Sequence, residues 1–182
     1  MELRAALKKK IIFILSLIMM FRLVPLRIAE CIGQFFPEDS TGCKIRGYLY
    51  KPFLKKCGKN FQVSLRVKLE NLNKIEIGDD VYVGYGSWLN GFKDGIILED
   101  EVMLGPYVTI VANNHTKFHS SYRFGPGSGG KVHIGKGTWL ASKVTVIAGV
   151  SIGIGVLVAA NAVVTKDIDS NVKVAGIPAR KI

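Results

Sequence analysis

The sequence predicts an all-β solenoid, a parallel β-helix of about five coils with one long loop over residues 111–133, preceded by a helical, basic and apolar N-terminal appendage. The main observation is a six-residue repeat from Ile134 to Asp169 that keeps one register over six consecutive units. A second is that the same period returns, with short slips, in earlier parts of the chain. This period fits neither an α-helix nor a long alternating strand, but it fits a short strand followed by a turn.

The first position of every repeat unit is apolar and mostly β-branched. It holds Ile134, Leu140, Val146, Ile152, Val158 and Val164. Three units would complete a triangular coil, in which these side chains point inward and stack on their equivalents one coil away. The second position holds Gly135 and Gly153, where the absence of a Cβ eases the corner. The period does not give the hand of the coil, and the general rule for parallel crossovers favours a right-handed one.

The period extends backwards to Cys57. First positions of the earlier units are Cys57, Val63 and Leu69, then Ile77, Val83 and Leu89, and finally Leu98, Leu104 and Ile110. Slips of two or three residues separate these groups, and a corner can bulge outward by that much without breaking the stack. We therefore expect the solenoid domain to span residues 57–182, with residues 1–56 forming a membrane-proximal segment and connector.

The charge of the chain is uneven. Of the 182 residues, 48% are hydrophobic and the formal net charge is +11, but residues 1–60 hold twelve Lys and Arg against four Asp and Glu. The basic excess therefore belongs to the N-terminal part, which favours a membrane surface or another anionic partner there. Arginines interleaved with aromatic residues would indicate a nucleic-acid surface, and the sequence lacks this pattern. We therefore expect no nucleic-acid partner.

The cysteines favour a reducing compartment. Cys31, Cys43 and Cys57 form neither a CxxC motif nor an even set that could pair as disulfides. A cytoplasmic location is therefore expected.

The N-terminal segment combines positive charge with an apolar run. Lys8, Lys9 and Lys10 precede an apolar stretch from Ile11 to Phe21, which covers roughly half of a ~30 Å hydrocarbon core. We interpret residues 8–27 as an interfacial helix in peripheral contact with the inner face of the cytoplasmic membrane. A signal peptide is one alternative, although no A-x-A site follows, and a helix that packs on the solenoid or on another subunit is the other.

Residues 31–56 are predicted to be an irregular basic connector. The residues expected to interrupt regular secondary structure here are Pro37, Gly42, Gly47 and Pro52.

The loop over residues 111–133 is the main functional clue. It is polar and rich in glycine, it holds all three histidines, and it is inserted between two units at a single corner. An insertion of this kind on one face of a solenoid usually marks the binding face.

Four features together resemble the hexapeptide-repeat acyltransferases. They are the repeats, NNH at 113–115, VTKDI at 164–168 and AGIPAR at 175–180. The similarity is closest to the galactoside, maltose and polysaccharide O-acetyltransferases; it covers about residues 57–182 and is absent from the first 50. It implies a left-handed parallel β-helix, acetyl-CoA as co-substrate, no metal, a carbohydrate acceptor, and a homotrimer with sites between subunits.

The resemblance also implies the catalytic group. Attack of a sugar hydroxyl on a thioester requires removal of the hydroxyl proton, and histidine suits this role near neutral pH. His115 matches the general base of the family, which forms no covalent acyl-enzyme.

Six residues match coenzyme contacts of the family. Ser142 and Ala160 correspond to backbone contacts with the pantetheine arm, and Trp139 to an aromatic wall beside it. Thr165 and Lys166 match residues near the nucleotide, and Arg180 would face its phosphates. Each also has a plain explanation, as a small corner residue, a packed indole or a solvated charge.

The acceptor site departs from the family. Gly84 replaces an asparagine of the galactoside enzymes, and the corner over residues 89–95 is rewritten as LNGFKDG. The acceptor of those enzymes therefore cannot be transferred to this chain. The nearest polar candidates for substrate binding are Asn90, Lys93, Asp94, Asn113 and Asn114.

We expect an O-acetyltransferase acting on a sugar hydroxyl of a surface polysaccharide or a lipid-linked glycan precursor. One alternative is an N-acetyltransferase that acts on an amino sugar or a small molecule. A zinc-dependent γ-class carbonic anhydrase could use His115, His119 and His133 as ligands, but it leaves TKD and GIPAR unexplained. A non-catalytic scaffold is the third alternative, and the intact NNH argues against it.

Overall fold

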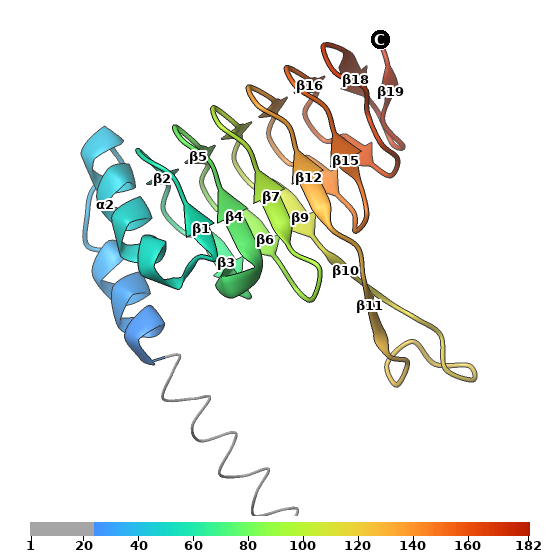
Figure 1. The fold of residues 1–182 in the computed structure, drawn as a ribbon, viewed down its shortest axis with the longest axis horizontal. Coiled ribbons are helices and arrows are strands. Elements are labelled where there is room, and N and C mark those ends of the chain that lie inside the picture. Colours follow the sequence, from blue (N-terminus) through green and yellow to red (C-terminus); the bar gives the residue numbers. More distant parts are fainter. Residues whose placement is uncertain (1–23) are drawn as a thin grey trace, which may run out of the picture.

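A computed structural model describes residues 24–182 of the chain (Figure 1). It contains a helical cap at one end, a stack of coils whose strands form three parallel sheets, and a two-stranded arm that projects from the stack. No helix among these residues is both long and apolar enough to cross a membrane. The apolar run Ile11–Phe21, on which the predicted membrane contact mainly rests, lies outside the described residues.

The strands form three sheets, here called A, B and C. Sheet A contains β1 (Lys56–Cys57), β4 (Ile75–Ile77), β7 (Ile96–Leu98), β12 (Val132–Ile134) and β15 (Ser151–Ile152). Sheet B contains β2 (Gln62–Val63), β5 (Tyr82–Val83), β8 (Met103–Leu104), β13 (Trp139–Leu140), β16 (Leu157–Val158), β18 (Lys173–Ala175) and β19 (Arg180–Lys181). Sheet C contains β3 (Lys68–Glu70), β6 (Trp88–Asn90), β9 (Thr109–Val111), β14 (Thr145–Val146) and β17 (Val163–Val164). One strand from each sheet, taken in chain order, makes one coil, and sheets A and C contain five strands each. The predicted solenoid of about five coils is therefore confirmed.

The inward ladder follows the predicted register. Ile134 pairs with Ile152, Leu140 with Val158 and Val146 with Val164, one coil apart, and all six side chains are buried. The earlier first positions, from Val63 to Ile110, are buried as well. The core is thus a column of aliphatic side chains along the solenoid axis, and each coil is stabilised by its neighbours.

Glycine at the second position has a different role from the one expected. The residues with positive φ at the corners occupy the fourth position, as Gly137, Lys143 and Asn161 do. A Cβ on Gly135 would instead lie 2.6 Å from the carbonyl carbon of Gly153 in the next coil. Gly135 therefore allows two backbones to stack closely, while the turn itself depends on the fourth residue.

The prediction of an irregular connector over residues 31–56 is wrong. Residues 24–33 are helical, α2 spans Ser40–Tyr50, and a 3-10 turn, η1, spans Lys51–Phe53. Asp39 caps α2 by accepting a hydrogen bond from the Gly42 N–H at 2.7 Å. A second 3-10 turn, η2 (Leu72–Lys74), follows β3.

The glycines of this region allow close packing and do not interrupt the helix. A Cβ on Gly47 would overlap the carbonyl oxygen of Phe61, and one on Gly42 would overlap that of Pro37. Both glycines are buried in α2, which therefore lies directly against the first coil.

Gly47→Ala should destabilise the protein although alanine is the better helix former. Helix propensity alone favours the change by about 1 kcal/mol, but the overlap with the Phe61 carbonyl forces α2 away from the coil. Such overpacking costs roughly 1–3 kcal/mol, so we expect a lower Tm in thermal unfolding. Thr41→Ala, at an exposed position of the same helix, is the control and should change stability by less than about 0.5 kcal/mol. A Gly47→Ala variant as stable as Thr41→Ala would contradict this packing.

Arg46 joins the helical cap to the first coil. Its buried guanidinium donates to the Val63 carbonyl at 2.7 Å, to the Phe36 and Pro37 carbonyls at 3.0 and 3.2 Å, and to Glu38 at 3.1 Å. The Glu38 carboxylate also accepts from the Leu65 N–H at 2.9 Å and from the Ser64 hydroxyl.

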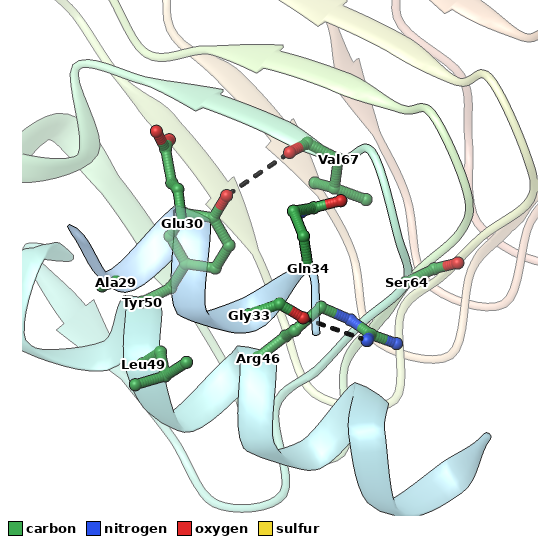
Figure 2. A pocket seen from close by; sticks show the side chains of 9 residues that line it. All are labelled: Ala29, Glu30, Gly33, Gln34, Arg46, Leu49, Tyr50, Ser64 and Val67. Carbon is green, nitrogen blue, oxygen red and sulfur yellow. Dashed lines mark hydrogen bonds between the residues drawn. The ribbon is translucent and has the colours of Figure 1, made fainter. Parts of the chain in front are cut away.

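The tyrosine Tyr50 makes a second connection between cap and coil. Its hydroxyl donates to the Val67 carbonyl at 3.3 Å, and burial raises the pKa of this phenol well above its usual value. Figure 2 shows Arg46 and Tyr50 around a small cavity between helix 24–33, α2 and the first coil. Its volume of about 10 Å³ suits one water molecule, so this crevice belongs to the packing of the cap.

Candidate functional site

The long insertion leaves the solenoid at the corner between sheets C and A. Val111 ends β9 and Val132 begins β12, so the inserted segment is residues 112–131, slightly shorter than predicted. His133 therefore lies on β12 and not in the loop. The corner over residues 91–95 joins the same two sheets one coil earlier, so it lies next to the insertion.

The insertion forms a two-stranded arm at its base. β10 (Asn113–His115) pairs antiparallel with β11 (Gly127–Gly129), and His115 lies opposite Gly127 (Figure 1). Thr116 closes the ladder, because its N–H and its hydroxyl donate to the Pro126 carbonyl at 3.2 and 2.6 Å. The NNH residues are thus held in extended backbone, and Asn113 and His115 share one face of the arm.

The corner over residues 91–95 supports this arm. The Phe92 ring lies against Gly127, where a Cβ would be 2.8 Å from its edge. The Lys93 ammonium group donates to the Gly127 carbonyl at 3.4 Å, and the Asp94 carboxylate lies against Gly129. The structure therefore brings Lys93 and Asp94 beside the strand pair that carries His115. Sequence reasoning missed Phe92, whose only signal is its place in the rewritten corner LNGFKDG.

Asn90, which was also predicted to contact the acceptor substrate, forms its hydrogen bonds within the corner. Its Oδ1 accepts from Asn71 Nδ2 at 2.8 Å and from the Phe92 N–H at 3.0 Å, and its Nδ2 donates to Glu70 at 3.2 Å. Hydrogen bonds from Lys68 and Trp88 lower the pKa of the Glu70 carboxyl. Asn90 and Glu70 thus shape the base of the arm, and a contact between Asn90 and sugar stays a prediction.

The three histidines lie in different surroundings. His115 is exposed, and no residue in the range 24–182 forms a hydrogen bond with its imidazole. His119 packs on Phe118 with ring centroids 4.3 Å apart, and His133 Nε2 lies 2.9 Å from Glu99 Oε1 on the outer side of sheet A. Across the described part of the chain, no group of three or more His, Cys, Asp or Glu residues is placed to share a metal ion.

Two of the predicted coenzyme residues stack at the corner between sheets B and C. Ser142 follows β13 and Ala160 follows β16, one coil apart. The Asn161 N–H donates to the Ser142 carbonyl at 3.0 Å, while within residues 24–182 the N–H groups of Ser142 and Ala160 donate to no acceptor. This edge therefore presents two backbone donors about 4.8 Å apart.

The other predicted coenzyme residues are spread over the solenoid. Trp139 is 41% exposed on the outer face of sheet B, between Met103 and Leu157 of the neighbouring strands. Arg180 is exposed on β19 of the same sheet. Thr165 and Lys166 are exposed at the corner between sheets C and A, on the same edge as the arm but two coils further along.

The predicted catalytic and coenzyme residues do not come together within one chain. Sheet C separates the edge with Ser142 and Ala160 from the edge with the arm, and a face of about five extended residues is roughly 15 Å wide. His115 and the two backbone donors therefore lie on different edges of the triangular coil.

Known proteins are similar to this chain in sequence. Galactoside O-acetyltransferase of Escherichia coli K12 is 31% identical over 158 residues, which cover 86% of this chain and 77% of the relative. A putative lipopolysaccharide biosynthesis O-acetyl transferase of the same organism, WbbJ, is 32% identical over 63% of this chain and 74% of its own length. No family model matches the chain.

Solved structures share the fold. A maltose O-acetyltransferase from Clostridium difficile 630 superposes with a TM-score of 0.75 at 26% identity, over 86% of this chain and 82% of that structure. A galactoside acetyltransferase in complex with coenzyme A gives a TM-score of 0.75 at 27% identity, over 87% and 78%. These matches identify the solenoid as a left-handed parallel β-helix, as the resemblance implied.

Proposed function

Because this chain belongs to the hexapeptide-repeat O-acetyltransferases, enzymes that depend on acetyl-CoA, we propose that it acetylates a sugar hydroxyl of a surface polysaccharide or of a lipid-linked glycan precursor. The observation that carries this proposal is that His115 lies on the two-stranded arm beside the polar corner of Lys93 and Asp94. Relatives named for lipopolysaccharide and colanic acid biosynthesis support the choice of acceptor class.

His115 acts as the general base in this proposal. Its imidazole takes the proton of the acceptor hydroxyl as the oxygen attacks the thioester carbonyl carbon. Collapse of the tetrahedral intermediate breaks the carbon–sulfur bond, and the imidazolium returns the proton to the departing thiolate of coenzyme A. No covalent acyl-enzyme is needed.

The coenzyme fits the donors at the corner between sheets B and C. Pantetheine carries amide carbonyls, and the N–H groups of Ser142 and Ala160 are the donors that such carbonyls require. Trp139 would form an aromatic wall on the same side of the solenoid. Lys166 and Arg180 would meet the phosphates, with Thr165 beside Lys166.

We propose a homotrimer because the two halves of the site lie on different edges of one chain. The outer face of sheet B offers an apolar ladder of Tyr82, Met103, Trp139 and Leu157 in register. The outer face of sheet A instead carries charged and polar pairs such as Lys55–Glu76 and His133–Glu99. A trimer in which the arm of one subunit reaches the donor edge of the next would complete the site.

We place the enzyme in the cytoplasm, with peripheral contact to the membrane. This rests on the sequence of residues 8–27, whose apolar run and flanking lysines suit the surface of an anionic bilayer.

Release of free thiol from acetyl-CoA in the presence of polysaccharide fragments tests the proposal. We expect release with hydroxyl acceptors, and the product should lose its acetyl group in mild alkali, as an ester does and an amide does not. An alkali-stable product formed only from amino sugars would favour N-acetyl transfer instead. Absence of release with any acceptor would favour a scaffold, and zinc-dependent hydration of carbon dioxide would favour the carbonic anhydrase.

A further inference from the structure

Helix 24–33 is apolar on two sides. One side packs on α2 and the solenoid, where Leu26 and Gly33 are buried. The opposite side presents Val24, Ile28 and Ile32, spaced four residues apart, with exposures of 42%, 54% and 45%. A spacing of four places these three side chains in one row along the helix. Phe35, just after the helix, is 85% exposed.

The polar residues of this helix leave that row uncovered. Arg27 and Glu30 form an ion pair with each other at 2.7 Å. The other exposed residues of this helix are Pro25 and Cys31, and neither is strongly polar. Within residues 24–182, no other segment covers this row, because its side chains are exposed there.

The net charge of the cap suits an anionic surface. Residues 1–60 hold twelve Lys and Arg against four Asp and Glu, and residues 24–56 alone hold six against three. One of these pairs, Arg46 with Glu38, is used inside the cap. Exposed lysines Lys44 and Lys51 therefore give the surface of the cap a positive excess.

We propose that the row formed by Val24, Ile28, Ile32 and Phe35 docks the helical cap onto an anionic lipid bilayer. The apolar side chains enter the boundary between headgroups and acyl chains while the basic side chains meet the headgroups. A second copy of the chain is a weaker occupant, because a stable interface needs about 800 Å² from each partner and these four side chains supply less. Helix 24–33 also lies in the cap at one end of the solenoid (Figure 1).

Flotation of the full chain with vesicles tests the docking. Phosphatidylcholine vesicles with about one-third phosphatidylglycerol should carry the protein, and neutral phosphatidylcholine vesicles should not. Ile28→Asp should lower the partition coefficient by about tenfold or more. Ile154→Asp is a matched control, because Ile154 is 53% exposed at a solenoid corner and the change in charge is the same. The control should bind as the unchanged protein does.

A fluorophore gives a second readout. Attached to Cys31 in a Cys57→Ser chain, an environment-sensitive probe should shift its emission to the blue with anionic vesicles. The thiol of Cys43 is buried and should not compete for the label. Two results would overturn the proposal. One is equal vesicle binding of the Ile28→Asp and Ile154→Asp variants. The other is a smaller oligomer for Ile28→Asp with vesicle binding unchanged, which would assign the row to a second copy. Neither result depends on acetyl transfer.

Discussion

Replacement of His115 by alanine should lower kcat for acetyl transfer by about 10²- to 10⁴-fold, which is the contribution of a positioned general base. The fold should be unaffected, because the imidazole is exposed and the pairing of β10 with β11 uses backbone groups only. Thiol release from acetyl-CoA measures the first effect and thermal unfolding the second.

His119→Ala provides the matched control. His119 is exposed on the same arm and packs on Phe118, so its loss removes an imidazole of the same region without removing the base. We expect it to retain kcat within a few-fold. A His115→Ala enzyme that matches His119→Ala in turnover would remove His115 from the mechanism.

Arg46→Ala should produce the largest loss of stability among single changes in the cap. The guanidinium serves the Val63, Phe36 and Pro37 carbonyls together with Glu38, and it is almost fully buried. Leaving a buried acceptor without its donor typically costs about 1–3 kcal/mol, and Arg46→Ala removes the donor of several carbonyl groups at once. Unfolding in urea, followed by circular dichroism, should show a correspondingly lower midpoint.

Two variants place that loss in context. Arg27→Ala removes an ion pair at the surface of helix 24–33 and should cost less than about 1 kcal/mol. Arg46→Lys keeps the charge but cannot donate to four acceptors at once, so it should fall between the two. If Arg46→Ala unfolded at the same midpoint as Arg27→Ala, the cap would not depend on this side chain.

The solenoid could be predicted because its core follows the chain in a fixed period. The inward positions, from Val63 to Val164, repeat along the sequence at the same interval at which the coils stack in space. The sequence pattern therefore also predicts which residues are in contact. The left-handed twist could not come from the period, and only the resemblance indicated it.

Helix α2 could not be predicted in this way. Gly42 and Gly47 are typical of loops when only neighbours in sequence are considered, but their role depends on carbonyl groups outside the helix, those of Pro37 and Phe61. The same limit applies to Arg46, whose acceptor on Val63 lies 17 residues away.

The candidate site was predictable in part. The arm and its NNH residues could be located, since an interruption of a regular repeat is visible in the sequence. The support of the arm by Phe92, Lys93 and Asp94 could not be predicted. It arises because two corners of successive coils lie side by side. The division of the coenzyme residues between two edges likewise follows from sheet topology, which sequence spacing does not give.

Backbone groups at both ends of the stack are paired within the chain, and we expect this pairing to keep the protein from polymerising. A stack of parallel strands can in principle be extended by further strands. An unpaired strand at the end of the stack could therefore pair with a strand of another chain, as the edges of amyloid fibrils do. At one end, side chains of Arg46, Glu38 and Tyr50 occupy the Val63, Leu65 and Val67 backbone groups. At the other, β19 folds back antiparallel on β18, and Gly176 and Ala179 bond to both backbone groups of Val163. Loss of the pairing at either end would expose a growing edge, so truncated chains should assemble end to end into fibres.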